Sequence, residues 1–183
     1  MNFTETKLKG CFILEPKIIQ DERGYFMESF NERTFQEGVG QKVHFVQDNQ
    51  SFSSKGVLRG LHYQTGEFAQ AKLVRVLQGE VLDVAVDIRP DSETFGQYEA
   101  VLLSETNQRQ FFVPRGFAHG FLVLSDTATF FYKCDNFYNK ESEGGIIFND
   151  SSIGIEWGFD TEKLIISEKD RLLPVLENAK KVW

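Results

Sequence analysis

The feature of this sequence that most constrains its fold is a rhythm of short apolar runs separated by turn signals. Turn-forming residues stand at positions 21–24 (Asp-Glu-Arg-Gly), 90–92 (Pro-Asp-Ser) and 143–145 (Glu-Gly-Gly). The clearest apolar run, Glu80–Ile88, alternates strictly, so that Leu82, Val84, Val86 and Ile88 share one face of a strand. Many short strands with tight turns are typical of an all-β sandwich or barrel.

The strand candidates and the scarcity of helix together predict a jelly-roll barrel with a few short helices. We expect helices only at Asn31–Glu37, with Asn31 as N-cap, and after Ser167, where Pro174 keeps the helix short. With no linker or repeat, residues 1–183 form a single predicted domain. The other strand candidates are Phe45–Phe52, Leu58–Gln64, Lys72–Leu77, Tyr98–Leu103, Gln110–Val113, Gly120–Leu124 and Ala128–Cys134.

Composition excludes several classes of function. The net charge of −7 argues against nucleic-acid binding, which needs a basic surface. No run of about 18 apolar residues is present, so we expect no membrane span. The N-terminus lacks the pattern of a signal peptide, and Cys11 and Cys134 are expected to be free thiols. We therefore expect a cytoplasmic protein.

The histidines suggest proton transfer rather than metal binding. There are only three, His44, His62 and His119, and no second histidine lies within ten residues of His62. Three histidines can bind a metal, but a histidine pKa near neutrality suits a proton carrier better. We expect no metal site and no cofactor.

The densest polar stretch runs from Val57 to Gln64 and is followed by Lys72. Arg59, His62 and Lys72 together would place a proton acceptor between two cations, although a surface strand with scattered charges has the same pattern. Strict alternation places Arg59 and His62 on opposite faces. A bulge at Gly60 would turn both toward one side.

Three further residues could be structural or functional. His119 follows a Pro-Arg-Gly turn at the start of a strand, where many histidines are structural. Tyr132 is the polar tip in the row Ala128, Phe130, Tyr132, Cys134, and a buried phenol needs a partner whether or not it is catalytic. Asp170 either belongs to a capping pattern that begins at Ser167 or orients a histidine, and its spacing favours the cap.

Distinctive sequence blocks follow one another along nearly the whole chain. They are the region from Asp21 to Phe30, QDN from Gln47, GVLRGLHYQ from Gly56, KLVRV from Lys72, DVAVDIR from Asp83, PRGFAHGF from Pro114, FYKC from Phe131 and SEKD from Ser167. Several ordered blocks are a stronger signal than any single short motif. Together they resemble the dTDP-4-dehydrorhamnose 3,5-epimerase family of the cupin superfamily.

The resemblance implies a metal-free jelly-roll enzyme, usually a homodimer, that acts on a dTDP-sugar. It implies that His62 removes protons from carbons 3 and 5 of a 4-keto sugar and that Tyr132 returns a proton to the opposite face. Asp170 would be the partner of His62, against the capping interpretation, and Lys72 would stabilise the enolate oxygen. His119 would lie near the sugar.

The resemblance also implies a set of binding residues. Arg23 and Arg59 would hold the pyrophosphate, since guanidinium groups pair well with phosphate oxygens. Phe26 and Tyr138 would stack on thymine, with some contacts crossing the dimer interface. The other implied contacts are Glu28, Gln47, Asn49, Glu143 and Lys169.

Three alternatives remain at this point. A relative could invert only carbon 3 of a deoxysugar, and the motifs do not separate that activity from double inversion. The chain could also be a nucleotide-sugar binding module without catalysis, or a metal-dependent cupin oxygenase.

Overall fold

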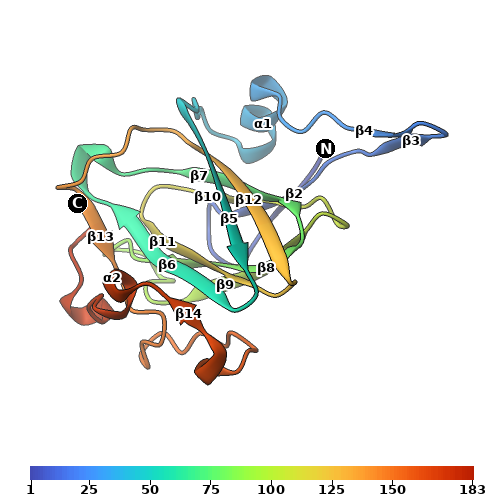
Figure 1. The fold of residues 1–183 in the computed structure, drawn as a ribbon. Coiled ribbons are helices and arrows are strands. Elements are labelled where there is room, and N and C mark those ends of the chain that lie inside the picture. The colour runs from blue at the N-terminus through green and yellow to red at the C-terminus, as the bar shows by residue number, and fades with distance from the viewer.

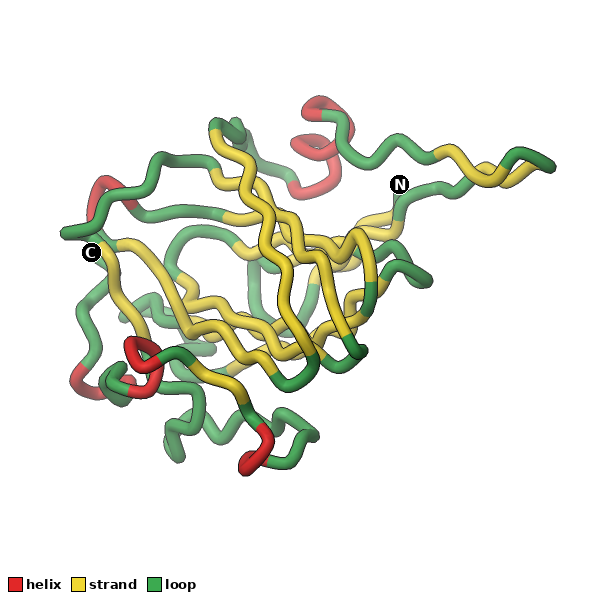
Figure 2. Tube along the Cα trace, viewed as in Figure 1, coloured by secondary structure: helices red, strands yellow, loops and turns green.

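Two antiparallel sheets face each other and close into a barrel in the computed structural model, which describes all residues 1–183 (Figure 1). The strand order is β1-β2-β10-β7-β12-β5 in the first sheet and β13-β6-β11-β8-β9 in the second, with β14 added in parallel to β6. This architecture confirms the predicted jelly-roll barrel. Figure 2 shows that the few helices are short and lie at the periphery.

The strands of the first sheet come from both halves of the chain. They are β1 (Asn2–Glu5), β2 (Phe12–Glu15), β10 (Gln110–Val113), β7 (Lys72–Gln78), β12 (Thr127–Cys134) and β5 (Gln47–Ser54). The turn signals and alternation place β7, β10 and β12 within one residue of the prediction. Two short strands, β1 and β2, were not predicted.

The second sheet forms the opposite wall of the barrel. Its strands are β13 (Glu143–Gly145), β6 (Val57–Gln64), β11 (Phe117–Val123), β8 (Glu80–Asp87) and β9 (Tyr98–Ser104), with β14 (Ile165–Ile166) alongside. Gly79, in a left-handed conformation with φ of 81°, makes the bend between β7 and β8. The triplet 143–145, interpreted as a turn, is instead the short strand β13.

The alternation along β8 separates two apolar clusters. Val81 and Ala85 pack inside the barrel, while Val84, Val86 and Ile88 pack on the outer face of the second sheet. The C-terminal part of the chain covers that outer face, with Trp157 and Val182 buried against it. The C-terminal segment is thereby fixed close to strand β6.

Helix α1 (Glu32–Val39) covers part of the outer face of the first sheet. Asn31 caps it, as predicted, because its side-chain oxygen accepts from the backbone N–H of Thr34 at 3.2 Å. The predicted end before Gly38 is wrong, since the helix continues to Val39 and ends with Gly40 in the left-handed region at φ of 70°. Helix α2 (Glu168–Arg171) is a single short turn before Pro174.

The hairpin of β3 (Ile19–Asp21) and β4 (Gly24–Phe26) projects away from the barrel (Figure 1). Its turn lies at the predicted Asp-Glu-Arg-Gly signal. The side chains of Tyr25 and Phe26 are 57% and 69% exposed, unusually high fractions for aromatic residues. The hairpin therefore presents apolar surface that this chain does not cover.

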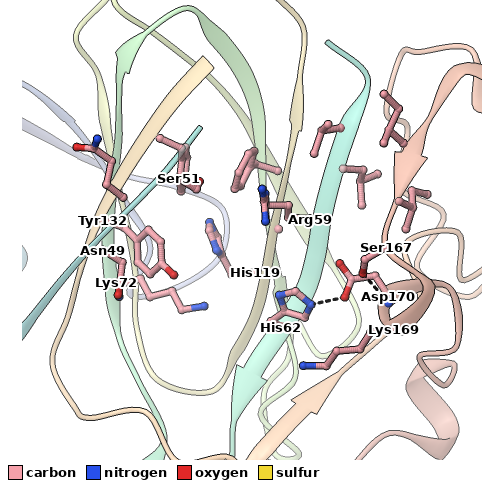
Figure 3. A pocket seen from close by; sticks show the side chains of 18 residues that line it. Asn49, Ser51, Arg59, His62, Lys72, His119, Tyr132, Ser167, Lys169 and Asp170 are labelled. Atoms are coloured by element: carbon pink, nitrogen blue, oxygen red, sulfur yellow. Dashed lines mark hydrogen bonds and ion pairs between the residues drawn. The ribbon is translucent and has the colours of Figure 1, made fainter. Parts of the chain in front are cut away.

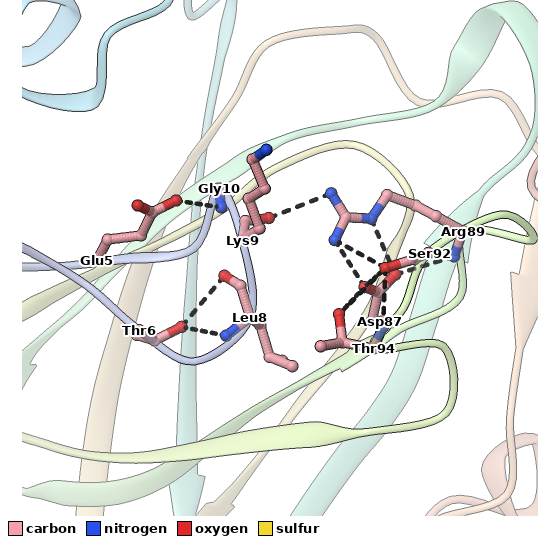
Figure 4. Close-up of polar contacts among 9 residues, drawn as sticks. All are labelled: Glu5, Thr6, Leu8, Lys9, Gly10, Asp87, Arg89, Ser92 and Thr94. Carbon is pink, nitrogen blue, oxygen red and sulfur yellow. Dashed lines mark hydrogen bonds and ion pairs between the residues drawn. The ribbon is translucent and has the colours of Figure 1, made fainter.

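A buried carboxylate joins the end of β8 to the N-terminal loop (Figure 4). Asp87 is fully buried and accepts hydrogen bonds from Arg89, Ser92 and Thr94. Arg89 in turn donates from Nη1 to the carbonyl of Lys9 at 3.1 Å. Burial raises the pKa of Asp87, but these hydrogen bonds outweigh it and leave the pKa below its ordinary value.

Among the helices, none is both long enough and apolar enough to cross a bilayer.

Candidate active site

A cavity of about 670 Å³ lies between the two sheets, and its lining includes most of the predicted site residues. A second cavity of about 350 Å³ adjoins it. The two cavities share Asn49, His62, Lys72 and Tyr132. The shared residues therefore stand at the middle of one elongated site.

A bulge at Gly60 turns both Arg59 and His62 toward the larger cavity. His119 pairs with His62 and Phe121 pairs with Arg59, so two steps on β11 match three on β6. Gly60 has φ of 131°, and a Cβ there would lie only 2.6 Å from the Cα of Gly120. Only glycine fits this close approach. The predicted bulge is confirmed, and it resolves the conflict with strict alternation.

Asp170 holds the ring of His62 from one side (Figure 3). Its Oδ1 lies 2.7 Å from Nε2 of His62, and its Oδ2 accepts from the backbone N–H of Gly60 at 3.3 Å. Burial raises the pKa of Asp170, but the hydrogen bonds from His62 and Gly60 outweigh it and lower the pKa overall. An ionised Asp170 makes Nε2 the protonated nitrogen of a neutral His62, so Nδ1 carries the free lone pair.

Ser167 does cap helix α2, as the capping pattern predicted. Its hydroxyl accepts from the backbone N–H of Asp170 at 3.1 Å. The carboxylate of Asp170 does not complete a capping box, because it points to His62 and Gly60 instead. The two interpretations of Asp170 are thus both realised, one through its backbone and one through its side chain.

Tyr132 and Lys72 stand on the wall opposite His62 (Figure 3). Tyr132 belongs to β12 in the first sheet, and the Nζ of Lys72 lies 5.9 Å from the centre of its ring. Burial raises the pKa of Tyr132 above its ordinary value. Burial also lowers the pKa of Lys72, although nearby Cys134, Asp83 and Glu143 oppose the shift. The raised pKa keeps the phenol protonated, and the amino group of Lys72 lines the cavity.

His119 forms a second imidazole–carboxylate pair on the same wall as His62. Its Nε2 lies 2.9 Å and 3.0 Å from the two carboxylate oxygens of Asp83, and Asp83 is fully buried. Sequence reasoning did not assign a role to Asp83. The available signal was a charged residue facing the barrel interior within the apolar run of β8.

The remaining predicted residues divide between the two cavities. Arg59 lines the larger one and donates from Nε to the hydroxyl of Ser53 at 3.1 Å. Glu143 in the smaller cavity accepts from Lys169 at 2.6 Å and from the hydroxyl of Tyr138 at 3.4 Å. The structure also brings Gln47 and Asn49 into this site.

Three predicted binding residues do not reach these cavities within one chain. Arg23 is at the tip of the projecting hairpin and pairs with Asp21, while Phe26 lies at the hairpin's base. Glu28 accepts from the side-chain amide of Asn31 at 3.2 Å. None of the three lines either cavity.

Ser51 is a cavity residue that sequence reasoning missed. It lies on β5 between Asn49 and Ser53, and its buried hydroxyl has no hydrogen-bond partner. A serine in a polar run carries no signal that could have singled it out.

The structure also contains no group of three or more His, Cys, Asp or Glu side chains arranged to hold a metal ion.

A jelly-roll barrel that holds an imidazole–carboxylate pair opposite a phenol, with cations beside both, is the architecture of an enzyme that moves protons on a small anionic substrate. The family model described as dTDP-4-dehydrorhamnose 3,5-epimerase matches residues 5–178 of the chain. The chain belongs to this family.

Individual relatives match along nearly the whole chain. The dTDP-4-dehydrorhamnose 3,5-epimerase of Shigella flexneri is 57% identical over 170 residues, which cover 93% of both proteins. The crystal structure of the Elizabethkingia anophelis epimerase is also 57% identical, with a TM-score of 0.95 over 100% of this chain and 99% of that one. An epimerase from Legionella pneumophila, solved with dTDP-4-keto-L-rhamnose, is 51% identical, with a TM-score of 0.93 over 97% of this chain and 93% of that one.

Proposed function

We propose that this enzyme inverts carbons 3 and 5 of dTDP-4-dehydro-6-deoxy-D-glucose to give dTDP-4-dehydro-L-rhamnose, in the biosynthesis of dTDP-L-rhamnose. The observation that carries the proposal is the pair of opposed groups, His62 on β6 and Tyr132 on β12, across one cavity. Inversion needs removal of a proton from one face of a carbon and delivery to the other. Two proton-transfer groups on opposite walls meet that need.

The first step is proton removal by His62. The 4-ketone acidifies the hydrogens on carbons 3 and 5, so one base can act at both positions if the sugar is repositioned between steps. Nδ1 of His62 takes the proton, while the carboxylate of Asp170 accepts a hydrogen bond from Nε2–H, with 2.7 Å between Nε2 and Oδ1, and stabilises the resulting imidazolium. The electron pair of the broken C–H bond moves to the ketone oxygen and forms an enolate.

The second step is reprotonation from the opposite face by Tyr132. The ammonium of Lys72 stabilises the enolate oxygen, because fixed positive charge acts strongly in a site that excludes water. Tyr132 then gives its proton to the carbon as the enolate collapses to the ketone. Solvent returns a proton to Tyr132 and removes one from His62, which resets the site for the other carbon.

Binding of the nucleotide is assigned to the polar residues around these groups. Arg59 pairs with the pyrophosphate, and Tyr138 stacks on thymine. The complex of the Legionella relative with dTDP-4-keto-L-rhamnose supports a ligand of this class. We assign further contacts to Gln47, Asn49, His119, Glu143 and Lys169.

The active form is proposed to be a homodimer in which each chain completes the other's site. Arg23, Phe26 and Glu28 lie at or beyond the projecting hairpin, outside the cavities of their own chain. The exposed ring of Phe26 supports a role against a second copy. A test is to mix inactive Arg23→Ala and His62→Ala chains, because mixed dimers should regain one intact site and part of the activity.

The proposed compartment is the cytoplasm. Cys11 and Cys134 are both unpaired and buried, which suits a reducing environment.

Incubation with dTDP-4-dehydro-6-deoxy-D-glucose in deuterated water tests the reaction. We expect deuterium at both carbon 3 and carbon 5 of the product. Label at carbon 3 alone would identify a single epimerase, and substrate binding without any label would identify a binding protein. A metal-dependent reaction would require activity that follows stoichiometric metal content.

A further inference from the structure

Gln64 is a buried polar residue at the end of β6, two positions after His62. It is only 5% exposed, and its side-chain amide makes three hydrogen bonds. Nε2 donates to the carbonyls of Phe68 at 3.0 Å and Phe137 at 3.1 Å, and Oε1 accepts from the backbone N–H of Asn139 at 2.6 Å. A buried amide used so fully fixes the backbone that it contacts.

Two of those three bonds bracket Tyr138. They reach the residues on either side of it, Phe137 and Asn139, in the segment 135–142, which we call the Tyr138 loop. This loop contains no helix or strand. Its other bonds include those from Gln70 to the carbonyl of Asn136 at 2.8 Å, from Asn136 to the carbonyl of Glu67 at 2.8 Å and from Arg115 to the carboxylate of Asp135 at 2.8 Å.

Tyr138 itself is weakly held by its side chain. Its ring is 56% exposed, and its hydroxyl has one bond, of 3.4 Å, to Glu143. The neighbouring Phe137 is 62% exposed, so apolar packing does not anchor the loop at this point. The position of the Tyr138 ring therefore depends on the backbone, and Gln64 is the buried group that fixes this backbone from both sides.

We infer that Gln64 is a positioning residue that holds Tyr138 where it stacks on the nucleobase, and so ties nucleotide binding to the strand that carries the base His62. The inference rests on the proposed function, because it takes the ligand to be a thymidine nucleotide. Gln64 does not touch the reacting carbons in this scheme. Its loss should weaken binding and leave the chemical step largely intact.

The variant Gln64→Met keeps the length of the side chain and removes all three hydrogen bonds. We expect the Kd for dTDP, measured by calorimetry, to rise about tenfold, which equals about 1.4 kcal/mol. KM for the sugar nucleotide should rise by a similar factor while kcat changes less than about twofold. This result is expected when the lost interaction binds the substrate and the transition state equally well. Gln64→Glu keeps an acceptor for Asn139 but places a carboxylate oxygen against the carbonyls of Phe68 and Phe137, so its loss should be at least as large.

The matched control is Gln36→Met. Gln36 lies on α1 and donates from Nε2 to the carbonyl of Val43 at 2.9 Å, so the same replacement removes the same kind of bond away from the cavities. It should lower thermal stability without changing the Kd for dTDP. Equal effects of the two variants on Kd would overturn the inference, because general destabilisation would then explain both.

A double-mutant cycle tests whether Gln64 acts through Tyr138. If it does, Gln64→Met should add little to the Kd of Tyr138→Ala, since the ring it positions is already absent. Fully additive effects would overturn the inference.

Hydrogen exchange separates this inference from the proposed function. In the free protein, Gln64→Met should accelerate amide exchange at residues 137–142 and leave β8 unchanged. Unchanged exchange in the loop would overturn the positioning role, whatever the wild type binds. Failure of the wild type to bind dTDP would instead overturn the proposed function and the nucleobase contact together.

Discussion

Nε2 of His62 lies 2.7 Å from Oδ1 of Asp170, although 108 positions separate the two residues in the chain. The bulge at Gly60 and the cap at Ser167 bring them together, one from each side. The contact selects the tautomer in which Nδ1 of His62 can take a proton.

Replacement of Asp170 by asparagine should remove that selection. An amide of the same size can donate to Nε2, which favours the tautomer with the proton on Nδ1. We expect kcat to fall by about 100-fold or more, within the range of a lost acid or base. Rates of deuterium incorporation check this. Ser167→Ala removes only the cap and should cost about 1 kcal/mol of stability with a much smaller loss of rate.

His62→Ala should abolish proton exchange at both carbons. We expect a loss of about 100- to 10,000-fold in exchange rate, the range typical for removal of a general base. The Kd for dTDP should stay within a few fold of wild type, since the imidazole acts on the sugar. Proton NMR in deuterated water gives both exchange rates. Substantial residual exchange would mean that another group is the base.

Tyr132→Phe should separate proton loss from completed inversion. The variant retains His62, so loss of substrate protons should survive better than formation of inverted product. In the wild type, burial raises the pKa of Tyr132, so its acid form persists as pH increases and is lost only above the ordinary tyrosine value of about 10. In the wild type, the rate of inversion should fall at high pH as Tyr132 loses its proton. In the variant, a plot of inversion rate against pH should not show this fall. Equal loss of exchange and inversion would count against the acid role.

Ser51→Ala should not destabilise the free protein. The buried hydroxyl of Ser51 has no partner, so its removal relieves an unsatisfied group and should change the free energy of unfolding by about 0 to 1 kcal/mol in the stabilising direction. Urea unfolding measures this. Ser53→Ala is the comparison, because it removes the bond from Arg59 at 3.1 Å and should cost about 1 kcal/mol.

Asp87→Asn should destabilise the fold by about 2 to 3 kcal/mol, since it weakens several bonds to one buried carboxylate. The lowered native pKa also gives a pH dependence. The stabilisation is complete above the unfolded value of about 3.9 and is lost as pH falls through the lower native value. Urea midpoints between about pH 3 and pH 7 should show this acid loss in wild type and a smaller one in the variant.

The strands that alternate clearly were predictable, and the short ones were not. Strand β8 has a strict period of two residues, so both its position and its two faces are as expected. Strands β3, β13 and β14 have three residues or fewer, too few for a period to emerge. Their pairing depends on neighbours that are distant in the chain.

The site was predictable where one segment carried the signal. The segment from Arg59 to His62 needed a bulge, and Gly60 indicated where it would be. Asp170 could not be placed by spacing, because local sequence favours a cap and only the tertiary fold brings its carboxylate to His62. Asp83 stood out only as a charge within an apolar run, and Gln64 lacked any distinguishing pattern, since the roles of both come from their partners.

The extra residue in β6 lets the guanidinium of Arg59 and the imidazole of His62 face the same cavity. If the same residues formed an even ladder beside β11, Arg59 and His62 would lie three steps apart, and either the guanidinium or the imidazole would point out of the barrel. A regular strand of the same sequence could therefore bind a phosphate or abstract a proton, but not both. Any attempt to transplant this chemistry into another barrel must carry the irregularity with it.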